Sequence, residues 1–145
     1  MNGAYIIVLY LNSNKRIKVG RLGKIYFKKG FYCYVGSAVG KTKIEKRCKR
    51  HLKKNKKLRW HIDYLRKESS IVKIVAFESK KRIECEIAKK ILRIADSYVE
   101  KFGSSDCKCV SHLFYFRNKK SLSKLSVVFS QFDYSTKQIF KVKIT

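Results

Sequence analysis

Residues 30–54 read GFYCYVGSAVGKTKIEKRCKRHLKK, and the rest of the chain can be placed around this stretch. Aromatic, β-branched and Cys residues from Phe31 to Val35 predict a buried strand, which we expect to end at Gly36. From Lys41 the apolar period changes to about 3.6 residues, which predicts a helix that packs a narrow apolar stripe against the sheet. The stripe consists of Ile44, Cys48 and Leu52.

The predicted helix also carries polar residues beside its apolar stripe. Arg47 and His51 lie four residues apart, so both side chains project from the same edge of the helix, near the end of the strand. Across the chain, 36 Lys and Arg residues oppose 10 Asp and Glu residues, a formal net charge of +26. Such a surface concentrates phosphate and gains affinity by releasing counterions, so we expect a polyanionic partner. The residues expected to contact nucleic acid are Lys43, Lys46, Lys49, Arg50, Lys53 and Arg59.

Charge alone favours a ribosome-associated or nonspecific nucleic-acid-binding protein over an enzyme. The 145 residues, 45% of them hydrophobic, suffice for one core, and no linker or repeat indicates a second. No apolar run reaches the roughly 18 residues of a membrane span, and no signal-peptide pattern is present. We therefore expect a cytoplasmic protein without a membrane role, whose five cysteines form no disulfide framework.

The strand patterns predict a small, mostly antiparallel sheet. Ala4 to Leu11 is a nearly continuous apolar run, as expected of a strand covered on both faces. Lys15 to Val19 alternates basic and apolar residues, and Lys24 to Phe27 is a further strand that could pair with Phe31 to Val35. Residues 71–78, IVKIVAFE, predict another strand after the helices.

Taken together, these motifs resemble the GIY-YIG nuclease superfamily. Its members carry Gly-x-Tyr in a first strand, Tyr-x-Gly at the end of a second, a helix with an Arg and often a His, and a later helix with a metal-binding Glu. The matching residues are Gly3-Ala4-Tyr5, Tyr34-Val35-Gly36, Arg47 and His51, and the GSA and EKRCKRH runs are similar to the homing-endonuclease branch.

The chain departs from the family pattern in two respects. Ala4 replaces the usual Ile, and 28 residues separate Tyr5 from Tyr34, which implies an insertion in the hairpin between the two motifs. The resemblance covers roughly residues 1–100, the length of one domain.

The later helix, expected from Arg82 to Ala95, offers two glutamates as the metal ligand. Glu84 is in line with a face that must be packed, whereas Glu86 shares a face with Lys and Arg residues and should be solvated. A carboxylate at the margin of a packed face is unusual unless it is paired or binds a cation. We therefore favour Glu84, with a surface salt bridge as the alternative.

The resemblance implies hydrolysis of phosphodiester bonds in DNA, duplex or structured, with RNA as a second possible substrate. Glu84 would bind Mg²⁺ or Mn²⁺ together with water and phosphate oxygens. Arg47 would stabilise the charge on the scissile phosphate. Tyr5 would orient or deprotonate the attacking water, provided that nearby cations lower its pKa, while Tyr34 and His51 assist. Without Arg47 and Glu84, strand packing would be the simpler explanation of the tyrosines.

Between these helices, a further helix is expected from Leu58 to about Lys67. Its His61 and Asp63 are either a polar pair near the active site or a DNA contact, or simply structural, with His61 in a local hydrogen bond.

The segment after Ala95 contains Cys107, Cys109 and His112 in a C-x-C-x-x-H pattern. They could form a zinc site with Cys85 or Cys33 as the missing ligand, or a tight loop with small buried thiols followed by a strand from Leu113 to Phe116. The run GSSDCKCVSHLF is similar to the end of an archaeal-type subfamily of these nucleases in which it has no assigned role.

The chain is therefore expected to adopt an α+β fold, a small antiparallel sheet flanked by helices. Residues 1–118 would form the nuclease-like domain including the Cys/His loop. Residues 119–145 would be an extension packed on it, with LSVVFS and KQIFKVKIT as strands around Phe132-Asp133-Tyr134. The predicted function is a metal-dependent endonuclease, and the alternative is a non-catalytic nucleic-acid-binding module of the same fold.

Overall fold

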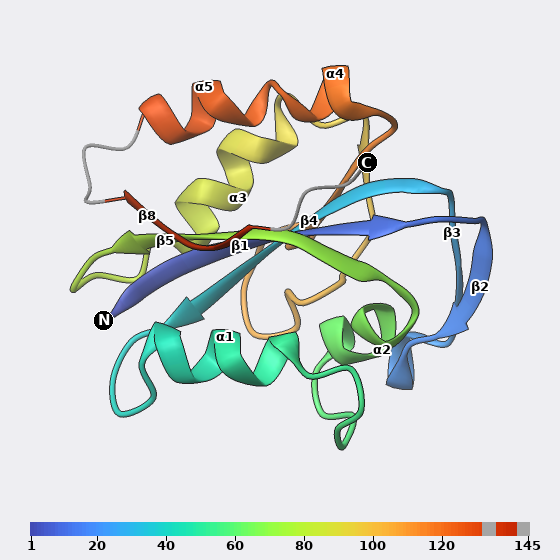
Figure 1. Cartoon of the computed structure of the whole chain (residues 1–145), viewed down its shortest axis with the longest axis horizontal. Coiled ribbons are helices and arrows are strands. Elements are labelled where there is room, and N and C mark those ends of the chain that lie inside the picture. The colour runs from blue at the N-terminus through green and yellow to red at the C-terminus, as the bar shows by residue number, and fades with distance from the viewer. Residues whose placement is uncertain (132–135, 142–145) are drawn as a thin grey trace.

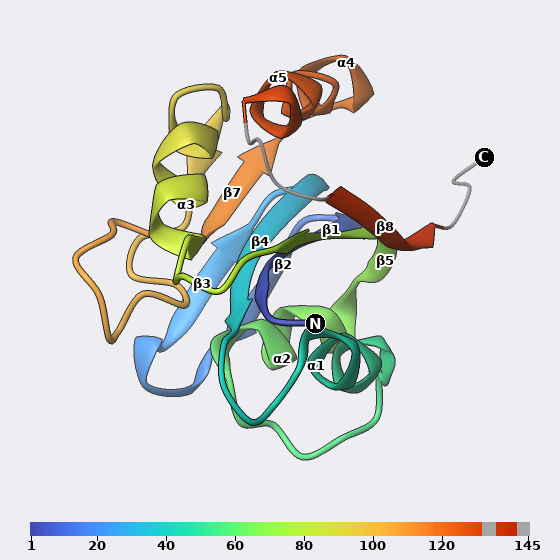
Figure 2. The same cartoon turned by 90° about the vertical axis from the view of Figure 1, so that its left-hand side faces the viewer.

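The computed structural model describes residues 1–131 and 136–141, the latter as a backbone strand. The predicted α+β class is confirmed: helices cover both faces of a six-stranded antiparallel sheet (Figures 1 and 2). The strand order is β6-β7-β4-β1-β5-β8. The bounds are β1 (Gly3–Leu11), β4 (Gly30–Ala38), β5 (Ser70–Glu78), β6 (Ser97–Tyr98), β7 (Leu113–Phe116) and β8 (Thr136–Lys141).

β1 is a central strand, which explains its continuous apolar sequence. Its side chains alternate between two cores: Ile6 and Val8 pack on one side, Ile7 and Leu9 on the other, and all four are fully buried. On one face lie α1 (Ile44–Leu52) and α2 (His61–Glu68). The opposite face carries α3 (Glu84–Leu92), α4 (Lys119–Leu122) and α5 (Leu125–Ser130). No helix in the described part of the chain has the length and apolar character needed to cross a membrane.

The expected insertion between β1 and β4 is confirmed as a hairpin with its own two-stranded sheet. It consists of β2 (Lys15–Lys18), a short 3-10 helix (Gly20–Leu22) and β3 (Lys24–Phe27). The pairing suggested between β3 and β4 is wrong, because β3 pairs with β2. The reason is that both edges of β4 are occupied, by β1 on one side and β7 on the other.

Several element ends differ from the predictions. β4 continues past Gly36 to Ala38 because β1 pairs with it over that whole length. The basic helix α1 begins at Ile44 rather than Lys41, and its stripe packs inward as expected. The helix expected from Leu58 begins at His61. The Asp63 side chain accepts hydrogen bonds from the backbone N–H groups of Arg59 and Trp60, which fixes the start of the helix there.

The tail contains the clearest error of secondary structure. LSVVFS forms helix α5 rather than a strand: Leu125 and Val128, three residues apart, are buried, while Val127 between them is 50% exposed. α5 packs beside α3, and both helices contribute residues to the same core. KQIFK lies in β8 and extends the sheet beside β5, as predicted, whereas Phe132-Asp133-Tyr134 lies outside the described residues.

Candidate functional site

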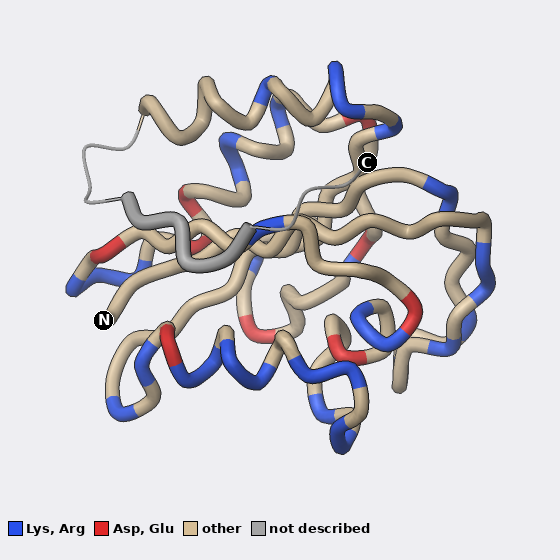
Figure 3. The backbone as a smooth tube through the Cα atoms, viewed as in Figure 1, with Lys and Arg blue, Asp and Glu red and all other residues tan. Residues whose placement is uncertain are grey.

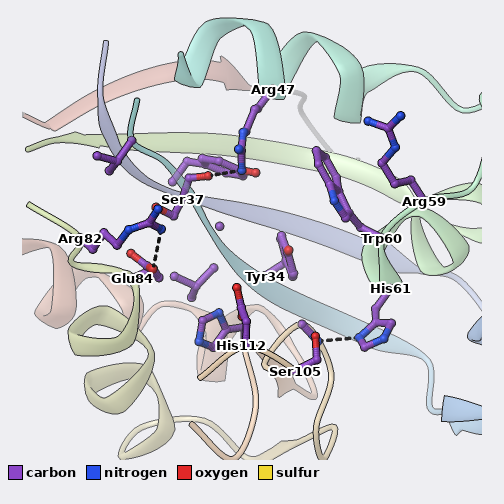
Figure 4. Close-up of a pocket in the computed structure, with 16 residues that line it drawn as sticks. Tyr34, Ser37, Arg47, Arg59, Trp60, His61, Arg82, Glu84, Ser105 and His112 are labelled. Carbon is purple, nitrogen blue, oxygen red and sulfur yellow. Dashed lines mark hydrogen bonds and ion pairs between the residues drawn. The ribbon is translucent and has the colours of Figure 1, made fainter. Parts of the chain in front are cut away.

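A pocket lies at the edge of β4, where its neighbour β7 stops. β7 pairs with β4 only from Phe31 to Tyr34. Just past this point the Val35 N–H still donates a hydrogen bond to the His112 carbonyl oxygen, and the uncovered edge beyond it, residues 36–37, lines a pocket of about 330 Å³ (Figure 4). Because the sheet ends here, side chains from α1 on one face and α3 on the other reach the same space.

Tyr5 of the first motif packs directly against Gly36 of the second motif at this edge. Tyr5 and Gly36 are directly paired across β1 and β4, and the Tyr5 ring covers Gly36. A Cβ atom on Gly36 would lie 2.3 Å from the Tyr5 ring, closer than non-bonded carbons can approach. Gly36 is therefore required by the position of the Tyr5 side chain, which is 2% exposed and reaches the pocket wall.

Tyr5 is hydrogen-bonded to a buried histidine behind the pocket. The Tyr5 hydroxyl and His51 Nε2 lie 2.8 Å apart. Burial raises the pKa of Tyr5 well above its ordinary value, although Arg47 acts in the opposite direction. Arg47 lowers this pKa, as expected of a nearby cation, but burial outweighs its effect. Burial and the charge of Lys56 lower the pKa of His51 to about 3, so the imidazole is neutral and its protonation is disfavoured in the unliganded protein.

Tyr34 lines the same pocket from β4. Its ring stands edge-on to that of His51, with 6.1 Å between centroids. Burial raises the pKa of Tyr34 above its ordinary value, so this phenol stays protonated at neutral pH.

Arg47 enters the pocket from α1. Its Nη1 donates a hydrogen bond of 2.6 Å to the carbonyl oxygen of Ser37 on the uncovered edge of β4. The guanidinium also lies 5.6 Å from the centre of the Trp60 ring. Arg47 Nε and Ser37 Oγ are buried and have no hydrogen-bond partner among the described residues.

Glu84 enters from the opposite face, as the first residue of α3 (Figure 4). Its side chain is 15% exposed, and Oε1 lies 3.8 Å from the guanidinium of Arg82. The other oxygen, Oε2, is buried without a hydrogen-bond partner in the described part of the chain. Glu86 is exposed and lies outside the pocket, as the helical pattern predicted. The expected helix start at Arg82 is wrong by two residues.

The unpaired atoms indicate what the pocket can bind. A buried polar atom without a partner costs on the order of 1–3 kcal/mol, so such atoms normally meet water or a ligand. Arg47 can contact an anion, and Glu84 can hold a cation through oxygen. The pocket therefore offers complementary groups for a metal ion and a phosphate side by side.

Asp63 and His61, considered above as a pair, have separate roles. Asp63 is buried and accepts two hydrogen bonds of 2.9 Å from Arg50, plus bonds from the backbone N–H groups of Arg59 and Trp60. Asp63 is thus structural. His61 Nδ1 accepts a hydrogen bond of 2.9 Å from the Gly103 N–H and also lines the pocket.

The six residues predicted to contact nucleic acid divide into three groups. Lys43, Lys46, Lys49 and Lys53 are exposed on or beside α1, where basic residues follow the helix in Figure 3. Arg59 is exposed and lines the pocket. Arg50 is different, because it is held by Asp63 and stacks 4.4 Å from the centre of the Trp60 ring.

Next to the pocket, the structure brings together a potential metal-binding cluster. Its ligand atoms all lie within 4.8 Å of one another. Of the two candidates for the missing ligand, Cys85 is present and Cys33 is buried in the sheet core instead. We refer to the four residues as the Cys3His cluster: Cys85, Cys107, Cys109 and His112.

Among the pocket residues that sequence reasoning missed are Ser37, Trp60, Arg82 and Asp106. Ser37 was visible only as part of the GSA run, and Arg82 as a cation two residues before Glu84. The ring of Trp60 contacts both Arg47 and Arg50, which no local pattern indicates. Asp106 lies in the loop that precedes β7 and carried no signal of its own.

Comparison with protein families places the chain in one of them. Residues 4–133 match the family described as a domain of unknown function, DUF123, and the chain belongs to that family. No curated protein and no solved structure gives a significant match.

Proposed function

We propose that the protein is a divalent-metal-dependent endonuclease that hydrolyses phosphodiester bonds in DNA. The proposal rests on one observation: Arg47 and Glu84 line the same pocket, and each has a buried polar atom, Nε and Oε2, without a hydrogen-bond partner among the described residues. The resemblance of Tyr5, Tyr34, Arg47 and His51 to the GIY-YIG superfamily supports the same function.

Glu84 is suited to hold the metal ion. Mg²⁺ and Mn²⁺ prefer oxygen ligands, and Mg²⁺ keeps several waters, so one carboxylate plus substrate oxygens can suffice. Bound at Glu84, such an ion would supply Lewis-acid polarisation of the scissile phosphate. Arg82, 3.8 Å from the other carboxylate oxygen, restrains the orientation of Glu84 from the solvent side.

Arg47 is suited to bind the scissile phosphate. Its guanidinium remains ionised and is oriented by the Ser37 carbonyl on one side and by the Trp60 ring on the other. Donors fixed in this way stabilise charge that develops on a phosphate without having to reorganise during the reaction.

Tyr5 and His51 provide a route for the proton of the attacking water. Because burial raises the pKa of Tyr5, the phenol is not a base by itself. Its hydroxyl can accept the proton of the water while it passes its own proton to His51 Nε2, 2.8 Å away, in the tautomer with the proton on Nδ1. Because the pKa of His51 is about 3 in the unliganded protein, this transfer requires the negative charge of bound phosphate, which favours the resulting imidazolium.

DNA is the proposed substrate because exposed lysines follow the helix that carries Arg47. Lys46 and Lys49 extend along α1, so they can contact backbone phosphates on either side of the cleaved bond. The non-catalytic binding module has the same basic surface but does not require Glu84. Metal-dependent cleavage therefore distinguishes the two functions.

The test is cleavage of labelled duplex, single-stranded and branched DNA, and of RNA, with Mg²⁺, Mn²⁺ or a chelator. We expect cleavage that requires metal and falls at least about 1,000-fold in Glu84→Gln and in Arg47→Ala. Glu86→Gln, an exposed change on the same helix, is the matched control and should cleave normally.

Binding should separate from cleavage in these variants. Glu84→Gln and Arg47→Ala should retain most DNA affinity, because many lysines share it, and Lys46→Ala should lower the log-log salt slope by about 1. Cleavage by Glu84→Gln at the wild-type rate would refute the site. Tight binding without cleavage across the panel would favour the binding module.

A further inference from the structure

The Cys3His cluster has the dimensions of a tetrahedral zinc site. Zn–S bonds of about 2.3 Å and Zn–N bonds of about 2.0 Å place the ligand atoms of such a site roughly 3.5–3.8 Å apart. In this protein, His112 Nε2 lies 3.5 Å from Cys107 Sγ and 3.8 Å from Cys85 Sγ. These two separations already match those that one ion would require, and all four ligand atoms lie within 4.8 Å of one another.

The chemistry of the four residues favours zinc over the alternatives. All five cysteines are free thiols, and a disulfide could join only two of the three in the cluster. Three sulfurs and an imidazole are soft and borderline ligands, which select Zn²⁺ rather than the Mg²⁺ or Mn²⁺ proposed for Glu84. Four protein ligands also fill the tetrahedral shell, which is typical of a structural rather than a catalytic zinc.

The cluster lies where an ion would join two segments of the chain that are distant in sequence. Cys85 follows Glu84 directly in the first turn of α3, while the other three ligands lie in the segment between Phe102 and β7. That segment also supplies one wall of the pocket through Gly103, Ser105 and Asp106. An ion at the cluster would fasten this wall to the start of α3.

We propose that the Cys3His cluster binds one structural Zn²⁺ that joins the loop before β7 to the first turn of α3. His112 belongs to both sites, since its side chain is a ligand of the cluster and lines the pocket. The zinc thereby fixes the pocket wall opposite Arg47 and the backbone that carries Glu84. It is distinct from the divalent ion that Glu84 would hold.

The first test is the metal content of the purified full-length protein. We expect about one zinc per chain, released by a strong chelator with a fall in Tm that Zn²⁺ reverses and Mg²⁺ does not. Replacement by Co²⁺ should give intense visible d–d bands and thiolate charge-transfer bands, the signature of a tetrahedral site with several sulfurs. This measurement uses the wild-type chain, so it does not depend on whether a variant folds.

Variants then assign the ligands. Cys107→Ser and Cys109→Ser should each lower zinc content severalfold at equal protein concentration, whereas Cys48→Ala, a buried thiol on α1 outside the cluster, should retain it. Glu84→Gln should lose cleavage and keep zinc, which separates this proposal from the proposed nuclease activity. Zinc-free protein that shows no Co²⁺ bands, or protein that contains iron and sulfide instead, would overturn the assignment.

Discussion

Asp63 and Glu84 are two buried carboxylates with opposite surroundings. Asp63 accepts hydrogen bonds from Arg50 and from two backbone N–H groups, and Lys56 lies 3.7 Å away. Glu84 forms an ion pair with the exposed Arg82, at 3.8 Å, and its buried Oε2 is unpaired among the described residues. The carboxylate with a full set of partners holds the segment between α1 and α2 in place, whereas the incomplete one faces the pocket.

The comparison shows how a structural charge differs from a functional one. Removing one member of a satisfied buried pair leaves the other charge buried and alone, which is costly. Removing a carboxylate that lacks partners relieves an unfavourable burial, so stability is little changed and only binding suffers. Substitutions at these two sites should therefore separate stability from activity.

The largest effect on stability is expected for Asp63→Asn. The change should reduce the free energy of unfolding by about 3–5 kcal/mol, because Arg50 and Lys56 lose their buried counter-charge. Urea denaturation followed by circular dichroism measures it. A loss within the range of surface substitutions would mean that Asp63 does not hold this segment.

Gly36→Ala should be the next most damaging change. Its new Cβ would overlap the Tyr5 ring, so Tyr5 must shift at a cost of about 1–3 kcal/mol. Cleavage should fall as well, because the Tyr5–His51 hydrogen bond depends on that ring position. Gly23→Ala is an informative control, because a Cβ there meets nothing within 4 Å although its φ of 79° costs some backbone strain. Equal stability and activity of the two variants would contradict the close packing of Tyr5 against Gly36.

His51 should make stability depend on pH in a defined direction. Its pKa falls from an ordinary value of 6.5 to about 3 in the folded protein, so the unfolded chain binds more protons between these values. The stabilisation that neutral His51 contributes to the folded state is complete above pH 6.5. It is lost as pH falls toward 3, by up to about 1.4 kcal/mol per pH unit.

Unfolding is measured between pH 5 and 6.5, above the range where most carboxylates titrate, and comparison with a His51 variant removes the contributions of His61 and His112, whose pKa values burial also lowers. His51→Gln should show a flatter dependence than the wild type. Identical slopes would mean that His51 is not buried as a neutral imidazole.

The smallest effect on stability is expected for Glu84→Gln. Its free energy of unfolding should stay within about 0.5 kcal/mol of the wild type, or rise slightly, since an unpaired carboxylate becomes neutral. Glu86→Gln serves as the reference on the same helix. A large loss would show that Glu84 has a structural partner, as Asp63 does.

The sequence predicted those features that depend on local periodicity. The apolar run of β1, the buried stripe of α1 and the contrast between Glu84 and Glu86 all follow from the spacing of apolar residues, and the structure confirms these burial patterns. The metal-binding role of Glu84 stays a prediction, because burial alone does not identify a ligand.

The features that failed depend on partners distant in sequence. Two adjacent valines made LSVVFS look like a strand, but packing against α3 selects a helix. The structural role of Asp63 was one of two alternatives and its partner was not identified, because Arg50 lies 13 residues away. The choice between Cys85 and Cys33 required the three-dimensional arrangement, because Cys33 packs in the same core as α3, which carries Cys85.

The central position of β1 also has a consequence for folding. Gly3 of β1 pairs with Ala38 of β4 and with Glu78 of β5. β1 is therefore synthesised before both of its neighbours, and β5 follows it by about half the length of the chain. Such non-local pairing raises contact order and slows folding compared with a helical protein of the same length. Until β5 emerges, the apolar residues of β1 have an open edge. A nascent chain of this protein therefore carries an aggregation hazard in β1 until β5 has been synthesised.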